Sequence, residues 1–341
     1  MTPIALMLLC AGTFAVAAVG TGLQRKYSLR SGLIDVPNER SSHSVPTPRS
    51  GGVAIFAAAV SGFIALRLLG SLDDALFRAL VFGGAAIALV GYLDDRMSLS
   101  ALLRLVVHLA AAAWVVYSIG GVPPLRLGAE VVDLGWAGQV FGVAAIVWVV
   151  NLFNFMDGID GIAASEALFV CVGAACLLGT SGTLPSTPAA LVFGAACAGF
   201  LLWNWPPAKI FMGDVGSGFV GFSIACLALG ASRGEPAAGI VFLILGGAFF
   251  VDATSTLVRR MIRGEHFYQA HRIHAYQWLA RRFGGHRPVL IGVIAINLLW
   301  LAPWGAAASR YPRYASGCLA AALLPLVVAA LIAGAGKREK V

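Results

Sequence analysis

Long runs of apolar residues, each bounded by charged residues, Pro or Gly, recur over the whole chain. A helix that crosses about 30 Å of hydrocarbon needs about 20 mostly apolar residues. By this measure the sequence predicts eleven spans, at residues 3–22, 51–70, 75–93, 101–119, 138–154, 161–179, 187–205, 215–232, 237–257, 287–306 and 314–335. The first run has no basic segment before it, so we interpret it as a retained helix and not as a signal peptide.

The composition supports this interpretation and excludes several classes of protein. Apolar and aromatic residues make up 59% of the 341 residues and charged residues only 12%, and the mean hydropathy is +0.84. A soluble domain carries about 25% charged residues, so a soluble enzyme, a disordered chain and a single-anchor protein are all excluded. The six cysteines lie in apolar runs without a CxxC pair, which is typical of buried apolar residues. We expect an all-α, polytopic membrane protein with one transmembrane domain over residues 1–341.

The basic residues predict how the chain is oriented. Cytoplasmic loops carry an excess of Lys and Arg, and an outside amino terminus puts most of the 24 basic residues inside. The exceptions are Arg67, Arg78, Arg126, Arg233, Arg310 and Arg313. The carboxyl terminus is then cytoplasmic, with cytoplasmic loops at about 23–50, 94–100, 155–161, 205–215 and 258–286. This topology accounts for the net charge of +8, so we expect anionic lipid or an anionic substrate as partner, and no nucleic acid.

The chain has only 16 acidic residues, and several of them lie at the predicted inner ends of spans. They are Asp94, Asp95, Asp157, Asp160, Asp214 and Asp252. A carboxylate near hydrocarbon is costly unless it is paired or binds a metal. Any one of these could be a solvated helix cap, but the first five lie in three short loops that are flanked by glycines and have almost no basic partners nearby. The pattern predicts a divalent cation, and all-oxygen ligands favour Mg²⁺, with Mn²⁺ as the second choice.

Three further segments are polar enough to bind an anion. The glycines of DGIDG and GDVGSG allow the backbone to approach a phosphate, although they also suit tight helix packing. In the loop 37–52, Arg40, His43 and Arg49 could cover an anionic substrate or belong to a solvated linker. His271 and His274 share a helix face but match no HExxH zinc motif. Their segment could also be an interfacial amphipathic helix, with Ile273 and Tyr276 at the headgroup boundary.

The motifs resemble those of the polyprenyl-phosphate N-acetylhexosamine-1-phosphate transferases, a family that transfers sugar phosphates to membrane lipid. The likeness runs from about residue 35 to 290. The family's Asn-x-x-Asn-x-x-Asp-Gly-x-Asp-Gly motif is matched in full from Asn151 to Gly161, and its Phe-Met-Gly-Asp motif by residues 211–214. The family's aspartate pair is matched by Asp94 and Asp95. Its three-histidine motif is matched only at its outer positions, because Ile273 replaces the middle histidine.

The resemblance implies a role for each matched residue. Asp94 and Asp95 would bind or deprotonate the lipid phosphate, with Asp94 as the base and Asp95 as its orienting residue or a metal partner. Asp214 would be the main Mg²⁺ ligand and Phe211 would stack on uracil. The catalytic set implied in this way also includes Asp157, His271 and His274. Substrate-binding roles are implied for Asn151, Asn154, Asp160 (which helps to hold uridine), Asn204, Phe211, Arg104, His43 and Arg49.

The implied reaction gives polyprenyl-diphospho-sugar and UMP from undecaprenyl or a similar polyprenyl phosphate and a UDP-N-acetylhexosamine. The resemblance also implies a bacterial inner membrane, a site facing the cytoplasm and a homodimer. The segment AHRIHAYQ is similar to that of the subgroup that initiates O-antigen and other surface polysaccharides. The alternative from another class is a cation-coupled secondary transporter, whose acidic residues should lie near the bilayer midplane in two related halves.

Overall fold

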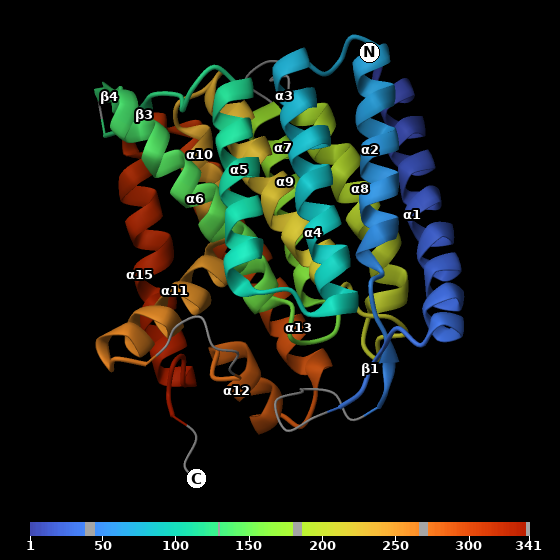
Figure 1. The fold of residues 1–341 in the computed structure, drawn as a ribbon. Coiled ribbons are helices and arrows are strands. Elements are labelled where there is room, and N and C mark those ends of the chain that lie inside the picture. The colour runs from blue at the N-terminus through green and yellow to red at the C-terminus, as the bar shows by residue number, and fades with distance from the viewer. Residues whose placement is uncertain (38–44, 129, 180–185, 266–271, 339–341) are drawn as a thin grey trace.

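A computed structural model describes residues 1–37, 45–128, 130–179, 186–265 and 272–338 of the chain. It is a bundle of long helices that run side by side, with the two termini at opposite ends (Figure 1). The helices are α1 (Pro3–Ser31), α2 (Gly52–Leu68), α3 (Asp74–Arg78), α4 (Gly84–Met97), α5 (Ala101–Ser118), α6 (Gly135–Met156), α7 (Ile162–Gly179), α8 (Ser186–Asn204), α9 (Asp214–Ser232), α10 (Ala238–Leu245), α11 (Gly247–Ile262), α12 (Ala275–Arg282), α13 (His286–Ile296), α14 (Ala302–Arg310) and α15 (Ala315–Ala333).

Shorter elements complete the fold. A π-helical turn, Ala79–Gly83, joins α3 to α4, another, Asn297–Leu301, joins α13 to α14, and a 3₁₀ turn, Pro312–Tyr314, precedes α15. Two antiparallel hairpins lie outside the bundle: β1 (Ile34–Asp35) with β2 (Thr47–Pro48), and β3 (Leu125–Leu127) with β4 (Glu130–Val132). They lie at opposite ends of the bundle (Figure 1).

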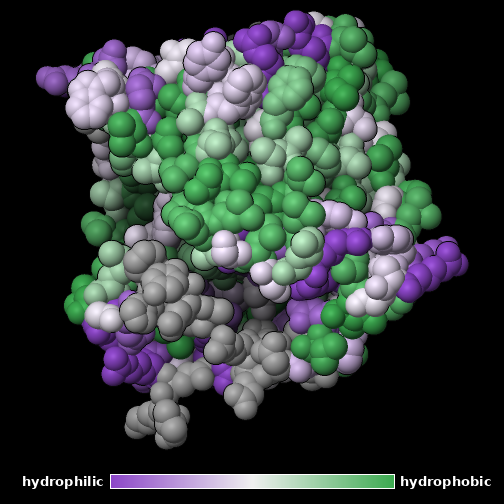
Figure 2. Space-filling view, viewed as in Figure 1, coloured by the Kyte–Doolittle hydropathy of each residue, from purple (hydrophilic) through white to green (hydrophobic). Residues whose placement is uncertain are grey.

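The all-α membrane architecture expected from the sequence is confirmed. Within the described residues, nine helices are long and apolar enough to cross a membrane, or ten if a bent pair counts as one span. Helix α2 is apolar but has only 17 residues. Each of the eleven predicted ranges therefore coincides with a helix or with a pair of helices. Hydrophobic residues cover the middle of the visible face, and hydrophilic residues gather at its two ends (Figure 2).

The ninth predicted range, 237–257, is not one straight helix. It contains α10 and α11, which meet at Gly246 with a bend of 74°. Sharp kinks occur at glycines because these residues tolerate a break in the helical hydrogen-bond ladder, and here Gly246 is followed directly by Gly247. The bend turns α11 away from the direction of α10 (Figure 1). The exposed side chains of Val258, Met261 and Ile262 lie on this second half.

Helix α9 is the centre of the bundle. Of its most apolar 18-residue stretch, 89% is buried, against 17% in α1 and in α15. A helix that is apolar all round is stable only where neighbours cover it or lipid surrounds it. Helices α4 and α6 pack directly on α9, which leaves α1 and α15 as the outer helices. The amino end of α9 carries Asp214, so the packing of α4 and α6 brings their carboxyl ends to that residue.

Glycines make this approach possible. A Cβ on Gly91 of α4 would collide with the backbone carbonyl of Asp214, and it would lie 2.6 Å from Val215 N. Likewise, a Cβ on Gly221 of α9 would lie 2.6 Å from the Val149 carbonyl oxygen of α6. Small residues at such contacts let helix backbones pack closely in membranes. Gly91 therefore determines how near α4 comes to the start of α9.

Candidate active site

Two aspartates from distant parts of the chain meet around one arginine. Arg104 Nη1 of α5 lies 2.6 Å from Asp94 Oδ2 of α4 and 3.4 Å from Asp214 Oδ2 of α9. The two carboxyl groups are also within hydrogen-bonding reach of each other. The Asp94 side chain is 8% exposed, whereas that of Asp214 is 37% exposed. Asp214 is therefore the member of the pair that a ligand can reach.

The sequence-based expectation that these acids lack a basic partner is wrong for this pair. Arg104 is ten residues from Asp94 and 110 from Asp214, and the resemblance implies only a substrate-binding role for it. Because α5 follows α4 immediately, it returns Arg104 to the carboxyl end of α4. The guanidinium partly neutralises two carboxylates that would otherwise repel each other.

Asp95 points away from this pair and holds the start of α9 in place. Its Oδ1 accepts a hydrogen bond from Asp214 N (3.0 Å), and its Oδ2 accepts one from Ser50 Oγ (2.8 Å). The residue is only 3% exposed. A carboxylate that accepts from the first N–H of a helix acts as a cap and is favoured by the helix dipole. Because both oxygens already have protein donors, this placement favours Asp214 over Asp95 as the metal ligand.

The end of α6 and the loop after it carry the Asn-x-x-Asn-x-x-Asp-Gly-x-Asp-Gly motif. This motif supplies a donor to Oδ1 of Asp214, the carboxylate oxygen that Arg104 does not contact. Asn154 Nδ2 donates to Asp214 Oδ1 (2.8 Å) and to Ser217 Oγ (3.0 Å). Asn151 Nδ2 instead donates to Val147 O, one turn back in its own helix. Burial raises the pKa of Asp157 well above its ordinary value, and the carboxylates of Asp214, Asp95 and Asp160 raise it further.

A mostly apolar hollow leads to this cluster from the side of the bundle. It has a volume of about 440 Å³ and is lined by residues of α4, α5, α6, α9 and α11. Its polar lining residues are Arg104, His108, Asn151, Asn154 and Asp214. Leu105 and Leu109 also line it, and they are 42% and 41% exposed on the apolar surface of α5. The hollow therefore connects the carboxylate pair with the lipid-facing surface.

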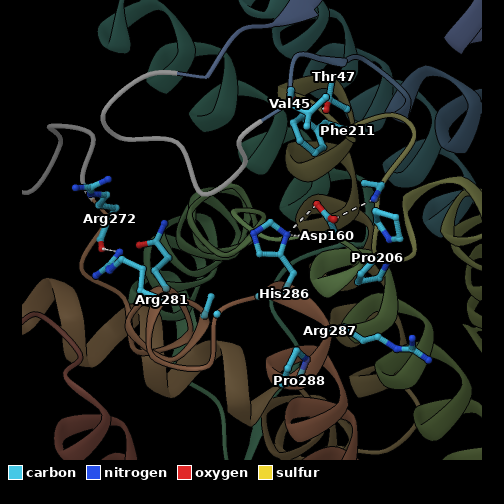
Figure 3. A pocket seen from close by; sticks show the side chains of 16 residues that line it. Val45, Thr47, Asp160, Pro206, Phe211, Arg272, Arg281, His286, Arg287 and Pro288 are labelled. Atoms are coloured by element: carbon cyan, nitrogen blue, oxygen red, sulfur yellow. Dashed lines mark hydrogen bonds and ion pairs between the residues drawn. The ribbon is translucent and has the colours of Figure 1, made fainter.

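A second hollow is wider and more polar, and Asp160, Phe211 and His286 are among the residues that line it (Figure 3). Its volume is about 830 Å³, and it is bordered by the loops after α6 and α8, by β2 and by α12 and α13. Asp160 and Phe211 lie in its wall together with Arg272, Arg281 and Arg287. Three guanidinium groups and an aromatic ring in one hollow suit an anion that carries a flat ring.

Two other sequence-predicted residues are occupied by contacts within the protein. Asn204, 2% exposed, accepts from Gly161 N (2.9 Å) and donates to Ile210 O (2.9 Å), so it ties the loop after α6 to the loop after α8. Arg49 donates through Nη2 to the backbone oxygen of Asp95. Both stabilise the walls of the site. His43 and His271 lie outside the described residues, as does Arg40.

Helix α12 borders the wide hollow, and Asp252 of α11 holds the start of this helix in place. Asp252 of α11 accepts hydrogen bonds from Ala275 N (2.8 Å) and Tyr276 N (2.9 Å) at the start of α12. Tyr276 Oη in turn donates to Phe155 O (3.0 Å), two residues before Asp157. The expectation that Ile273 and Tyr276 lie at the headgroup boundary is wrong, because both are buried against the protein. Their apolar surface packs on the bundle instead of on lipid.

His274 is also buried, at 1% exposure. Its Nδ1 lies 3.5 Å from Asp252 Oδ1, and its ring packs between those of Phe155 and Tyr276. The resemblance implies a catalytic role for His274, but in this structure its ring lies inside the protein and not in the open site. Sequence reasoning missed Ser50 and His286, and it gave no positioning role to Asp252 or Tyr276. The position of Asp252 near the end of a span could have indicated a role for it. Nothing in the sequence around Ser50 or Tyr276 indicates their roles.

The carboxylate pair suits a magnesium ion. Within the described ranges, no three His, Cys, Asp or Glu side chains are arranged to enclose an ion. Mg²⁺, however, takes only one or two protein carboxylates and completes its shell with water and phosphate oxygens. Asp214 supplies one such carboxylate, partly exposed beside a hollow, with the less exposed Asp94 next to it. The donor chemistry therefore fits Mg²⁺.

Comparison with known proteins identifies the family. A sequence model of glycosyl transferase family 4 matches residues 77–232. The chain is 32% identical over 289 residues to a probable undecaprenyl-phosphate N-acetylglucosaminyl 1-phosphate transferase of Bacillus subtilis, covering 82% of this chain and 78% of the relative. It is 31% identical over 347 residues to a decaprenyl-phosphate N-acetylglucosaminephosphotransferase of Mycobacterium tuberculosis, covering 92% and 85%.

A third relative matches over a shorter stretch. The phospho-N-acetylmuramoyl-pentapeptide-transferase of Moorella thermoacetica is 33% identical over 158 residues, covering 46% of this chain and 48% of the relative. The chain belongs to glycosyl transferase family 4, the polyprenyl-phosphate N-acetylhexosamine-1-phosphate transferases. It is a membrane-embedded transferase, and the transporter alternative is set aside.

Proposed function

We propose that the protein transfers N-acetylhexosamine-1-phosphate from a UDP-sugar to polyprenyl phosphate, with Mg²⁺ as cofactor. The observation that carries the proposal is the position of Asp214. This residue lies where an apolar hollow open to the lipid ends at a carboxylate–arginine cluster. Helix α6 and the loop after it carry both Asn154, which donates to Asp214, and Asp160, which lines the wide polar hollow. A lipid acceptor and a soluble donor would need two such entrances.

The wide hollow is the site proposed for the UDP-sugar. Phe211 supplies an aromatic face for uracil, and Arg272, Arg281 and Arg287 supply positive charge for the diphosphate. Asp160 offers a carboxylate that can accept from the donor groups of uridine. Helix α12, which borders this hollow, lies at one end of the bundle (Figure 1), so a water-soluble nucleotide sugar can enter the hollow without crossing lipid.

The apolar hollow is the site proposed for polyprenyl phosphate. Leu105, Leu109 and Trp148 line its walls, whereas Arg104 lies at its polar part. The prenyl chain would keep its contact with apolar surface while the phosphate reaches the guanidinium. Arg104 already bridges Asp94 and Asp214, so a phosphate bound there would be held beside both carboxylates.

The reaction follows from this placement. An oxygen of the polyprenyl phosphate attacks the β-phosphorus of the UDP-sugar, and the bond from that phosphorus to the bridging oxygen breaks. The bond's electron pair leaves with UMP, and a new phosphorus–oxygen bond gives the polyprenyl-diphospho-sugar. Asp94 is the proposed base, because it lies against Arg104, where the lipid phosphate would bind. A phosphate monoester loses its second proton near pH 6, so the base has little work to do, and positioning and charge neutralisation dominate.

Asp214 would hold the magnesium ion, with water and phosphate oxygens as its other ligands. When bound, the ion supplies charge neutralisation for the diphosphate of the donor. Asn154 fixes the orientation of the Asp214 carboxylate through its hydrogen bond of 2.8 Å. Asp95 fixes the backbone from which Asp214 projects. The chain's own residues therefore prepare the ligand geometry before the substrates arrive.

The first experiment tests the activity itself. Purified protein is incubated with polyprenyl phosphate, Mg²⁺ and one of several UDP-N-acetylhexosamines, and UMP release is followed. We expect release that needs both the lipid and the metal and that stops on chelation. The names of the relatives support UDP-N-acetylglucosamine as the first donor to try. No UMP with any donor, from wild type and Asp214→Ala alike, would contradict the proposal.

The proposed biological setting is the inner membrane of a bacterium, where the product would start an O-antigen or a related envelope polysaccharide. The resemblance of AHRIHAYQ to that subgroup supports it. Loss of surface polysaccharide on deletion of the gene, with peptidoglycan synthesis intact, would be the expected phenotype. Loss of peptidoglycan precursors instead would assign the enzyme to the cell wall.

The orientation gives a separate prediction. Met97, 68% exposed, follows the carboxylates of α4, whereas Trp136, 80% exposed, lies at the start of α6 near β4. We expect a cysteine at position 97 to react with an impermeant maleimide only after permeabilisation, and one at position 136 in intact spheroplasts. The wild-type chain controls for the six native cysteines. The opposite labelling pattern would overturn the proposed cytoplasmic site.

A further inference from the structure

His286, at the first position of α13, contacts Asp160 through a single atom. Its Nδ1 lies 3.1 Å from Asp160 Oδ1 and 3.3 Å from the backbone nitrogen of the same residue. The two side chains are 15% and 12% exposed. In Figure 3 the imidazole ring points toward Asp160 from the opposite wall of the wide hollow. Neither the motifs nor the family resemblance assigns a role to this histidine.

The contact is available in both protonation states of the ring. When Nδ1 carries a proton, it donates to Oδ1 of Asp160. When Nδ1 is unprotonated, it accepts from the Asp160 N–H. The other carboxylate oxygen, Oδ2, accepts from Ala208 N at 3.0 Å. Asp160 is thus held between the loop after α8 on one side and the start of α13 on the other.

Helix α13 is anchored firmly enough to act as a support. Asn297, where the helix passes into its π-helical turn, donates through Nδ2 to Glu166 Oε2 of α7 at 2.6 Å. Glu166 is fully buried and Asn297 is 2% exposed. Since α7 begins directly after the loop that carries Asp160, the loop–α7 segment is tied to α13 at two points. His286 forms the tie at the hollow, and Asn297 forms the tie inside the bundle.

We propose that His286 is a positioning residue that orients Asp160 for the nucleotide of the donor substrate, and so sets the affinity for the UDP-sugar. The inference rests on the function proposed above. His286 acts on binding through Asp160 and lies outside the cluster of Asp94, Arg104 and Asp214. Its loss should therefore weaken donor binding much more than it slows the chemical step.

The test is a set of substitutions of similar volume. H286F keeps a ring without a polar atom, H286N keeps an amide near the position of Nδ1, and H286Q carries its amide farther out, near the position of Nε2. A hydrogen bond to a charged group is stronger than one between neutral groups, so we expect H286F to raise KM for the UDP-sugar about tenfold or more. We expect kcat to change by less than about threefold. H286N should restore KM to within about threefold of wild type, and H286Q should not.

Two further variants separate the outcomes. G292A, on the same helix with nothing within 4 Å of the added Cβ, controls for a general disturbance of α13 and should behave as wild type. In the double variant D160N/H286F, the histidine substitution should add little, because its partner is already altered. Equal KM values for H286F and H286N, or fully additive effects with D160N, would overturn the inference.

The inference and the proposed function can fail separately. UDP binding is measured by calorimetry on wild type and on each variant, independently of turnover. A wild-type protein that releases no UMP from any donor would contradict the proposed function. Wild-type UDP affinity in H286F would overturn the role of His286 whether or not the protein is active. Thermal unfolding of each variant identifies those that fail to fold. If H286F fails to fold, the test is the difference in KM between H286N and H286Q.

Discussion

Asp214→Asn is expected to lower the rate of UMP release about a thousandfold or more. The substitution keeps the size of the side chain and an oxygen for Asn154, but it removes the charge of the proposed metal ligand. A metal contributes several kcal/mol to transition-state stabilisation, and each 1.36 kcal/mol corresponds to a factor of ten in rate. The measurement is the initial rate of UMP release over a range of Mg²⁺ concentrations, where D214N should also need more metal.

The matched control is Asp74→Asn. Asp74 begins α3, is 50% exposed and pairs with Arg67 and Arg78. An exposed ion pair contributes about 0–1 kcal/mol to stability, so D74N should retain the wild-type rate within about twofold. Retention of activity by D214N, with D74N equally active, would show that the carboxylate is not needed and would remove the basis of the mechanism.

Gly91→Ala is expected to lower activity about a hundredfold or more, although it changes none of the proposed active-site side chains. The added methyl group would meet the backbone of Asp214 and Val215, which cannot move aside in the way that the end of a flexible side chain can. Helices α4 and α9 must then separate at the point where Asp94 and Asp214 meet. A misplacement of about 1 Å can cost a factor of about 100 in rate, and overpacking costs about 1–3 kcal/mol in stability.

UMP release and the midpoint of thermal unfolding, both in the same detergent, check this prediction. Gly12→Ala in α1 and Gly317→Ala in α15 are the controls, because a Cβ at either position meets nothing within 4 Å. Both should match wild type in activity and stability. If G91A is as active as these controls, the distance between α4 and α9 does not limit catalysis.

The arrangement around Arg104 explains how acidic residues can share a site at the edge of a membrane. Asp94 and Asp214 carry like charges in contact, which is unfavourable where water is scarce. Arg104 offsets part of that repulsion, and we propose that Mg²⁺ offsets the rest. A phosphate that approaches Arg104 would therefore be brought directly to the pair. The same guanidinium thus stabilises the acids and serves the proposed acceptor.

The helices themselves could be predicted because their apolar runs are long and end at charged or polar residues. The burial of α9 could not be read from its composition, which resembles that of the outer helices. Its position depends on Gly91 and Gly221, whose importance lies in what they touch. Similarly, Gly246 is one of 41 glycines, and only the packing of α10 and α11 distinguishes it as the site of the 74° bend.

Among the site residues, the sequence by itself determined which acids lie at the ends of helices and which motifs they belong to. Only the tertiary structure decided their tasks: Asp95 caps α9, Asp252 caps α12, and Arg104 joins Asp94 to Asp214. The physical reason is that hydrophobicity is a local property of the chain, whereas a hydrogen bond needs two groups within about 3 Å. For groups more than a hundred residues apart, that distance is set by the packing of the whole bundle.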